Sequence, residues 1–322
     1  MTFPPELVSI VIPTCNGKSD LLRLLPALFS QKADFRFEVI CIDSGSGDGT
    51  WELLETYPVR RVRIASSQFS HGGTRNLGIE ISRGPIVVLL TQDAIPDRDD
   101  WLATLVSNYA DPRVAGVYCR QVPRPDGPLL PKIDARLWVT GRQQRHENRL
   151  GDHPDYPQLP PHQRRLLCNF DDICSSLRKS VWEQFPYRPV NFAEDLEWGK
   201  RVFEAGYTLV FEPRARVVHS HDRSFVYELK RSFLTYETLD RLFGIGDEGY
   251  TFRQALRDVA RAPWGLPAVY PDLRQEPPGD RLRAYWIILA RALGRASYAL
   301  WHRRLRSRPI GRRIQRCLTR GV

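Results

Sequence analysis

Hydrophobic positions in the first 120 residues of this 322-residue chain form short, β-branched runs separated by stretches with helical spacing. The runs at 8–13, 37–43 and 85–90 are nearly continuous, which is typical of strands buried on both faces of a parallel sheet. Apolar residues at 21–29 and from Trp51 onward recur with the spacing of amphipathic helices. This alternation of strand and helix predicts an α/β fold with a mostly parallel sheet flanked by helices.

The pattern changes near residue 225. Before it, further strands are expected at 62–64, 114–118, 170–177, 208–211 and 215–218, with helices at 101–109, 132–150, 179–185 and 196–205. After it, helical spacing extends over 226–243 and 283–304, with a Gly/Pro-rich linker between. We therefore expect an α/β domain at 1–225 and a helical C-terminal extension at 226–322.

Charge is distributed unevenly along the chain, whose net charge is +10. Residues 281–322 hold twelve arginines and no acid, whereas 1–280 carry 35 basic and 37 acidic side chains. A near-neutral body with a basic tail favours contact of the tail with an anionic membrane surface and argues against nucleic-acid binding. The amphipathic spacing of 283–304 fits either that contact or packing on the core.

The sequence predicts neither a signal peptide nor a membrane-spanning helix. The N-terminus lacks a basic segment followed by an apolar run, and the chain lacks the stretch of about 18 uncharged apolar residues that a membrane span needs. The six cysteines include no CxxC pair, which predicts neither a zinc site nor a disulfide framework. We therefore expect a protein of the reducing cytoplasm.

Polar residues follow the first two predicted strands directly. Thr14 and Asn16 come after the first strand, and Asp43 opens a Gly-rich loop at 43–50 after the second. The carboxyl ends of parallel strands meet at one edge of a sheet, where ligands bind, so these side chains should face one crevice. A tight turn is the simpler explanation of the loop alone.

Two further positions have the chemistry of a phosphate and a cation site. Arg75 follows the pair Gly72-Gly73 at a predicted helix start, from which it could reach a phosphate. Asp93 follows the buried run at 85–90 and precedes Pro96, a suitable place for a hard cation.

Glu194 and Asp195 stand where a loop becomes the helix at 196–205. Carboxylates at a helix start commonly cap N–H groups. A carboxylate in a ligand-binding cleft can instead act as a general base. His219 and His221 end the last predicted strand, where a histidine is often a structural hydrogen-bond partner.

Several of these motifs, in this order, resemble the inverting nucleotide-sugar glycosyltransferases of family 2, which have the Rossmann-like GT-A fold. The resemblance covers about 6–225. It rests on the residues at 9–14, 42–50, 75–76 and 194–195, on 201–207 and on His219. The residues at 71–76, 91–96 and 219–221 resemble bacterial rhamnosyltransferases, which use dTDP-L-rhamnose to build surface polysaccharide.

The resemblance implies roles for individual residues. The nucleotide-binding half (1–120) would hold the donor, and the half at 121–225 the acceptor. The expected donor-binding residues are Pro13, Thr14, Asn16, Asp43, Arg75, Gln92 and Asp93. Asp93 matches the last acid of the Asp-x-Asp metal motif, Thr91 replaces the first, and His219 is the further ligand for Mg²⁺ or Mn²⁺. Asp195 matches the general base, with Glu194 supporting it; His221 is left as an acceptor or phosphate contact.

The sequence thus predicts transfer of L-rhamnose from dTDP-L-rhamnose to a hydroxyl of an O-antigen or capsule-type glycan or a lipid-linked acceptor. The expected location is the cytoplasm, at the inner face of the plasma membrane. The alternatives are another donor (UDP-Gal, UDP-GlcNAc or GDP-Man) and a non-catalytic nucleotide-binding partner of a glycan-assembly complex, which Thr91 in place of an acid would favour.

Overall fold

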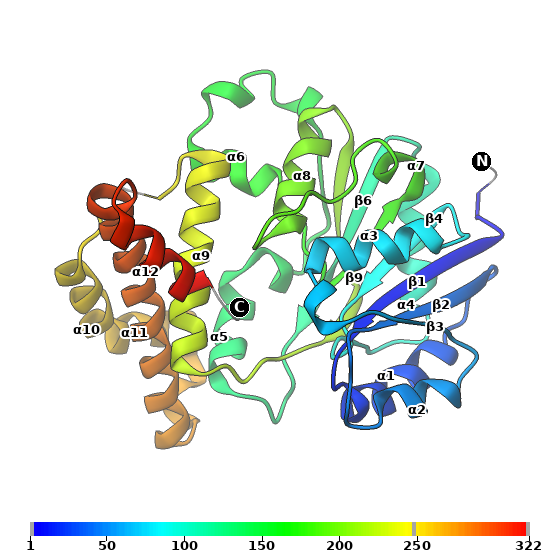
Figure 1. Ribbon diagram of the computed structural model, residues 1–322, viewed down its shortest axis with the longest axis horizontal. Helices are drawn as coiled ribbons and strands as arrows, with labels where there is room; N and C mark the ends of the chain where they lie inside the picture. The colour runs from blue at the N-terminus through cyan, green and yellow to red at the C-terminus, as the bar shows by residue number, and fades with distance from the viewer. Residues whose placement is uncertain (1–2, 247–248, 320–322) are drawn as a thin grey trace.

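A single curled sheet of nine strands organises the chain (Figure 1). The structure is a computed structural model and describes residues 3–246 and 249–319. The strands are β1 (Leu7–Thr14), β2 (Arg36–Asp43), β3 (Arg60–Arg63), β4 (Ile86–Leu90), β5 (Ile95–Pro96), β6 (Val114–Val122), β7 (His146–Asn148), β8 (Cys174–Arg178) and β9 (Thr208–Val218).

The strand order is β3-β2-β1-β4-β8-β6-β9-β5, and β7 pairs with β9. The first four positions, β3 to β4, are mutually parallel, and β6 is parallel to β9. The strand β8 lies between β4 and β6 and is antiparallel to both. The expected α/β fold with a mixed, mostly parallel sheet is therefore confirmed.

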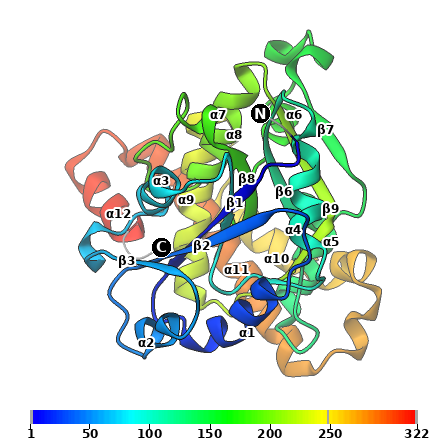
Figure 2. The same ribbon diagram turned by 90° about the vertical axis from the view of Figure 1, so that its right-hand side faces the viewer.

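Helices cover both faces of the sheet (Figure 2). Their bounds are α1 (Lys18–Phe29), α2 (Thr50–Glu55), α3 (His71–Ile81), α4 (Trp101–Ser107), α5 (Leu129–Leu137), α6 (Pro161–Leu167), α7 (Lys179–Trp182), α8 (Glu194–Glu204), α9 (Phe225–Phe243), α10 (Phe252–Val269), α11 (Pro278–Leu300) and α12 (Pro309–Thr319).

The central strands supply side chains alternately to two cores. Ile10 and Ile12 of β1 face the core formed with α1 and α4, whereas Val11 faces the core formed with α3 and α8. All three side chains are fully buried. Burial on both faces explains the nearly continuous apolar run that predicted this strand.

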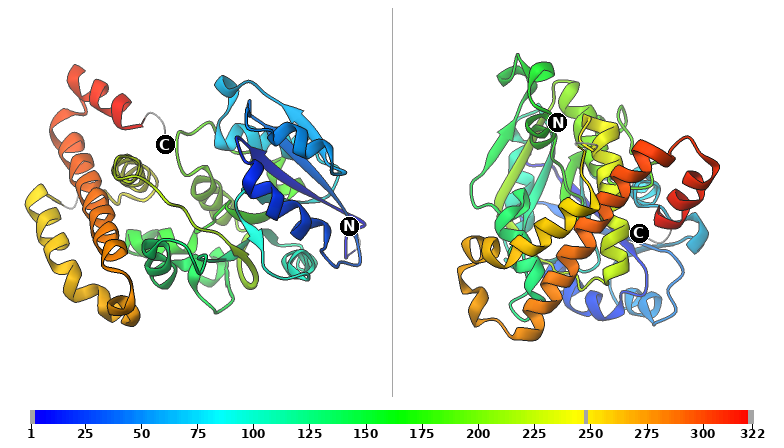
Figure 3. Two further views of the ribbon diagram at one scale, coloured as in Figure 1. Left: turned by 90° about the horizontal axis from the view of Figure 1, so that it is seen from below. Right: turned by 90° about the vertical axis from the view of Figure 1, so that its left-hand side faces the viewer.

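The C-terminal helices form a group beside the sheet domain (Figure 3). The helix α11 packs along α9, α10 lies against α11, and α5 contacts both α10 and α11. The predicted helices at 226–243 and 283–304 correspond to α9 and α11, the latter continuing as one π-helical turn over 301–305. The division at residue 225 stays a prediction, because α5 of the first part packs into this helical group.

Several local expectations were wrong. The supposed linker before residue 283 contains α10, which continues through Pro263 and Pro267. The expected helix at 132–150 ends at Leu137, because 146–148 pair with β9 as the edge strand β7. The two strands expected at 208–218 form one strand, β9. Residues 170–173 precede β8 and are not part of it.

The expectation of no disulfide was also wrong, since Cys119 and Cys174 are disulfide-bonded. They lie on the adjacent strands β6 and β8. Fifty-five residues separate them in sequence, so their spacing carries no sign of the pairing. Among the helices described, none has the length and apolar character needed to cross a membrane.

Candidate active site

Asp93, His219 and His221 converge at the carboxyl end of the sheet. Asp93 lies in the turn between β4 and β5, and both histidines follow β9. The antiparallel β5–β9 pair, in which Ile95 is opposite Val218, brings that turn beside the end of β9. Asp93 Oδ2 lies 3.4 Å from His219 Nε2 and 3.4 Å from His221 Nδ1, and the three ligand atoms are within 4.8 Å of one another.

The chemistry of this trio fits a divalent cation. His219 is buried, and its Nε2 atom has no hydrogen-bond partner among the described residues, which is costly unless a ligand uses the lone pair. Burial opposes ionisation of Asp93, but the two histidines hold its pKa well below the usual range. Burial and the neighbouring His219 and Arg223 lower the pKa of His221 to about 3, so Asp93 and His221 are in metal-binding form at neutral pH.

Thr91, which by resemblance replaces the first acid of the metal motif, offers a neutral hydroxyl and no carboxylate charge. Its backbone N–H donates to the carbonyl of Ile173 at 3.0 Å. The sequence placed Asp93 and His219 together, and the structure adds His221, whose role the sequence left open. The single residue between the two histidines was the available signal, but it required both side chains to face the same side beyond the strand end.

A second group is built on the first turn of α8. Glu194 forms an ion pair with Arg75, which reaches it from α3, and Arg75 Nε lies 3.6 Å from Asp172 Oδ2. Arg75, Glu194 and Asp172 are 5%, 6% and 1% exposed. Burial disfavours the Arg75 charge, yet the two carboxylates raise its pKa above the ordinary value. Arg75 is thus a buried cation held by two anions.

Asp195 lies beside this ion pair. Its Oδ2 accepts a hydrogen bond from the Asp172 N–H at 3.3 Å, and its Oδ1 accepts one from the Leu196 N–H at 2.7 Å. Burial first, and then the charges of Glu194, Asp172 and Asp171, raise the pKa of Asp195 well above the usual range; Arg75 offsets this only in part. A carboxylate with a raised pKa is a stronger base.

The capping explanation of the carboxylate pair receives partial support. Ala193 occupies the N-cap position with a left-handed φ of 55°, and no side chain caps the helix there. Asp195 satisfies one N–H of the first turn, but Glu194 is turned to Arg75. One carboxylate therefore serves the helix start while its neighbour serves the buried ion pair.

The segment before β8 links the two groups. Thr91, two residues before Asp93, donates to Ile173, and the adjacent Asp172 donates to Asp195. Asp172 was missed by the sequence analysis, which placed it inside a strand. Burial raises its pKa to about 6, although Arg75 and the Ser175 hydroxyl lower it.

The loops after β1 and β2 form a third group. Thr14 is opposite Asp43 in the β1–β2 register. Asp43 is fully buried, and its carboxylate accepts from the N–H groups of Gly45 (3.2 Å) and Ser46 (3.1 Å) and from the Ser46 hydroxyl. Arg63 lies 3.5 Å from it. The Gly-rich segment is therefore a turn organised by Asp43, as the simpler explanation proposed.

Asn16 and Gln92 connect these loops to the end of β4. Asn16 exchanges two hydrogen bonds with the 43–50 loop, through Ser46 Oγ (2.8 Å) and the Gly47 N–H (2.9 Å). Gln92 accepts from the Cys15 N–H at 2.9 Å and donates to the Cys15 carbonyl at 3.2 Å. Pro13 lies at the carboxyl end of β1, so Pro13, Asn16 and Gln92 lie at the same edge of the sheet.

Residues 9–161 match the family model described as Glycosyl transferase family 2. The chain carries a glycosyltransferase family 2 domain. The matched segment of this glycosyltransferase contains Asp43, Arg75 and Asp93. It ends before Asp195 and His219, so the assignment of these two depends on the geometry described above.

The glycosyltransferase is similar to known proteins over most of its length. It is 29% identical over 291 residues to the O-antigen chain rhamnosyltransferase WbaN of Salmonella anatum, covering 86% of this chain and 89% of that protein. It is 29% identical over 293 residues to RfbN of Salmonella typhimurium, also an O-antigen chain rhamnosyltransferase, covering 87% and 90%.

The structural comparison confirms the GT-A fold. The mannosyltransferase PcManGT from Pyrobaculum calidifontis, in complex with GDP-Man and Mn²⁺, has a TM-score of 0.57 and 19% identity, with 94% of this chain and 89% of that chain covered. Staphylococcus aureus TarS 1-349, in complex with UDP-GlcNAc, has a TM-score of 0.53 and 14% identity, with 92% and 91% covered.

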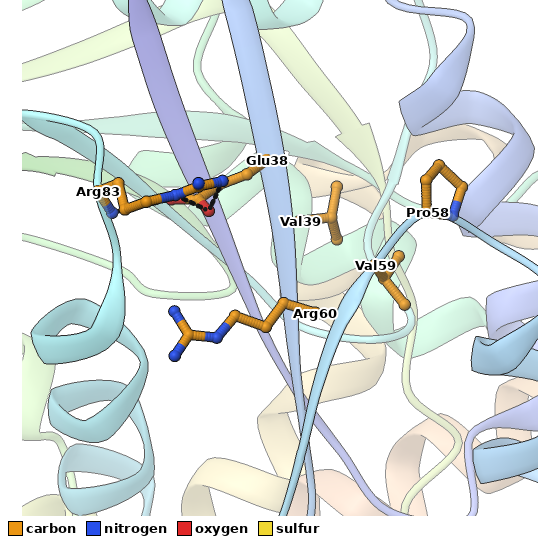
Figure 4. A pocket seen from close by; sticks show the side chains of 6 residues that line it. All are labelled: Glu38, Val39, Pro58, Val59, Arg60 and Arg83. Carbon is orange, nitrogen blue, oxygen red and sulfur yellow. Dashed lines mark hydrogen bonds and ion pairs between the residues drawn. The ribbon is translucent and has the colours of Figure 1, made fainter.

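Hollows on the surface of the described residues differ in how they relate to the candidate site. One of about 350 Å³ is bordered by Asp93 and His221 and by Arg124. Another, of about 480 Å³, lies near the amino ends of β2 and β3, between Glu38 and Arg60 (Figure 4). Ligands of parallel sheets bind beyond the carboxyl ends of the strands, so the first hollow belongs to the candidate site and the second does not.

Proposed function

We propose that this glycosyltransferase moves L-rhamnose from dTDP-L-rhamnose to a hydroxyl of an O-antigen or capsule-type glycan or a lipid-linked acceptor, with inversion at C1. The observation that carries the proposal is Asp195, a carboxylate of raised pKa that is linked through 172–173 to the Asp93 trio. The names of the two rhamnosyltransferase relatives support the choice of sugar.

Asp195 acts in this proposal as the general base. The acceptor hydroxyl loses a proton to Asp195 as its oxygen attacks C1 of the sugar, and the bond from C1 to the diphosphate breaks on the opposite face. A single base without a covalent nucleophile gives inversion. Glu194 supports the base by holding Arg75 in place, and its charge raises the proton affinity of Asp195.

Mg²⁺ or Mn²⁺ is the proposed cofactor, held by Asp93 and His219. His221 would supply the third ligand atom and so compensate for Thr91. A divalent ion bound there would stabilise the negative charge of the diphosphate leaving group. Two imidazoles among three ligand atoms fit Mg²⁺ less well than the all-oxygen sites that it prefers.

The donor nucleotide is proposed to bind at the carboxyl ends of β1, β2 and β4, in the nucleotide-binding half at 1–120. Pro13, Thr14, Asn16, Asp43 and Gln92 line that edge, and Asp43 would accept the ring N–H of thymine. That contact requires Asp43 to exchange part of its bonding with Gly45 and Ser46. Arg75 is assigned to the donor phosphates on resemblance, although its ion pairs and its hydrogen bond to the Asp172 carbonyl tie it to Glu194 and Asp172.

The acceptor is assigned to the half at 121–225, on the Asp195 side. Its class, a surface-polysaccharide precursor, follows from the relatives' names. We infer from that class that the enzyme works in the cytoplasm, at the inner face of the plasma membrane, where lipid-linked acceptors would be reached.

The test is donor turnover. The full chain is incubated with dTDP-L-rhamnose and Mg²⁺ or Mn²⁺, and released dTDP is measured against UDP-Gal, UDP-GlcNAc and GDP-Man. Preference for another nucleotide sugar would replace the donor. Binding of nucleotide without turnover on any donor, in the presence of a glycan-lipid extract, would favour a non-catalytic role in a glycan-assembly complex.

A further inference from the structure

The helix α10 carries a row of exposed apolar side chains. Phe252, Leu256, Ala260 and Trp264 recur every four residues and therefore share one face. Trp264 is 79% exposed and Leu256 is 60% exposed. Figure 3 shows α10 along the outer edge of the C-terminal helices, with α11 between it and α9. The apolar row thus faces away from the body of the protein.

Three arginines form a second row next to the apolar one. Arg253, Arg257 and Arg261 also recur every four residues and are all exposed. In the described parts of the chain, none of the three has a carboxylate partner. The acid on the same helix, Asp258, accepts a hydrogen bond from the Tyr250 hydroxyl at 2.7 Å. The row therefore presents uncompensated positive charge beside the apolar side chains.

The opposite face of α10 is packed, so the exposed row has a defined orientation. Ala255 is fully buried in a cluster with Ala296 and Ala299 of α11. Leu266 and Val269 pack in a second cluster to which α5 and α11 contribute. Because α10 already packs through another face, its apolar row is not a packing surface that lacks its partner within the helical group.

The neighbouring helix α11, which the charge pattern had suggested as the membrane contact, is less suitable. Arg291 pairs with Asp134 at 2.9 Å and with Glu228 at 2.7 Å. Arg295 lies over the rings of Tyr236 and Tyr250. Arg291 and Arg295 thus contact residues of the protein itself, whereas the three arginines of α10 are exposed to solvent.

We propose that α10 binds the surface of an anionic lipid bilayer, with the apolar row (Phe252, Leu256, Ala260 and Trp264) inserted among the headgroups and the arginine row (Arg253, Arg257 and Arg261) on lipid phosphates. An apolar stripe with an aromatic side chain, bordered by arginines, is the arrangement that lies in a membrane interface. Charge complementarity selects an anionic lipid surface over a neutral one. This inference does not depend on the donor or on Asp195.

The test uses the full chain, because removing α10 or α11 would expose the clusters they bury. Cosedimentation is measured with vesicles of phosphatidylcholine alone and of phosphatidylcholine mixed with phosphatidylglycerol. We expect binding to the mixed vesicles that high salt reduces. The double variant Leu256→Ser/Trp264→Ser and the triple variant Arg253→Gln/Arg257→Gln/Arg261→Gln should each need at least about tenfold more lipid for half binding.

The matched control removes three exposed arginines of the sheet domain, Arg36→Gln/Arg83→Gln/Arg113→Gln, and should bind as the unaltered chain does. Circular dichroism and thermal unfolding establish that each variant is folded. Equal binding to both vesicle types, or unchanged binding of the Leu256/Trp264 variant, would overturn the proposal. So would light scattering that shows a dimer which this variant dissociates, since the row would then cover a second copy of the chain.

Discussion

Replacing Arg75 by Met should lower the free energy of unfolding, because Glu194 and Asp172 would then be buried without a cation. Arg75 is 5% exposed and pairs with Glu194 and Asp172, which are equally buried. Methionine fills a similar volume without the charge, so the two carboxylates remain in the interior without their cation. Breaking a buried pair in this way costs about 3–5 kcal/mol. We expect that loss of unfolding free energy at pH 7.5.

The loss should depend on pH in a defined direction. Arg75 lowers the pKa values of Asp172 and Asp195, whose folded-state values are nonetheless raised, that of Asp172 to about 6. Without Arg75 these values rise further, so the folded variant takes up protons as the pH falls from 7.5 to 5.5. Proton uptake by the folded state favours folding. The deficit should therefore shrink on acidification, by up to about 1.4 kcal/mol for each pKa unit gained.

Urea unfolding at both pH values, followed by circular dichroism, measures this effect. The control Arg98→Met removes an exposed arginine that pairs with Asp100, and it should leave the unfolding free energy nearly unchanged at either pH. Arg75→Lys keeps the charge and should fall between the two. A deficit for Arg75→Met below about 1 kcal/mol, or one that is the same at both pH values, would refute the account of Arg75 as the cation that holds this group together.

Four further outcomes are expected. Asp195→Asn should lower kcat by about 10²–10⁴-fold with little change in donor affinity. It should also raise Tm as the pH rises, because the stability contributed by a carboxyl with a raised folded pKa is lost as the pH rises through that pKa, whereas an amide does not ionise. The acid limb of the kcat profile should lie above pH 4, the region in which an unperturbed Asp titrates, about 3.9. His221→Ala should weaken Mn²⁺ binding by at least about tenfold in calorimetry, unlike His153→Ala. Asp43→Asn should raise KM for the donor more than it lowers kcat.

The sheet was predictable where the chain obeys local periodicity. The β1, β2 and β4 strands are buried on both faces and read as nearly continuous apolar runs, so their positions followed from the sequence. The α10 helix was missed because Pro263 and Pro267 are read as helix breakers. The edge strand β7 has three residues, too few to show a period of two. Local signals therefore failed where tertiary contacts decide the conformation.

The candidate site divides in the same way. Thr14 and Asp43 end their strands and Asp93 follows β4, and the ends of these strands were visible in the sequence, so their common edge could be predicted. The contact of Arg75 with Glu194 could not, because 119 residues separate them and no local pattern links α3 to α8. The third member of that ion-pair group, Asp172, was hidden in a segment that resembled a strand.

The antiparallel strand β8 explains why the two halves of the site meet. A parallel strand at this position would bring its amino end to the opposite edge of the sheet from the ends of β1, β2 and β4. Because β8 runs the other way, its start lies beside the end of β4, where Leu90 is opposite Cys174. The residues just before β8 can then accept from Thr91, donate to Asp195 and pair with Arg75 at once. The single reversed strand between β4 and β6 thus joins the candidate metal trio to the candidate base, and no feature of residues 170–178 read in isolation would disclose that direction.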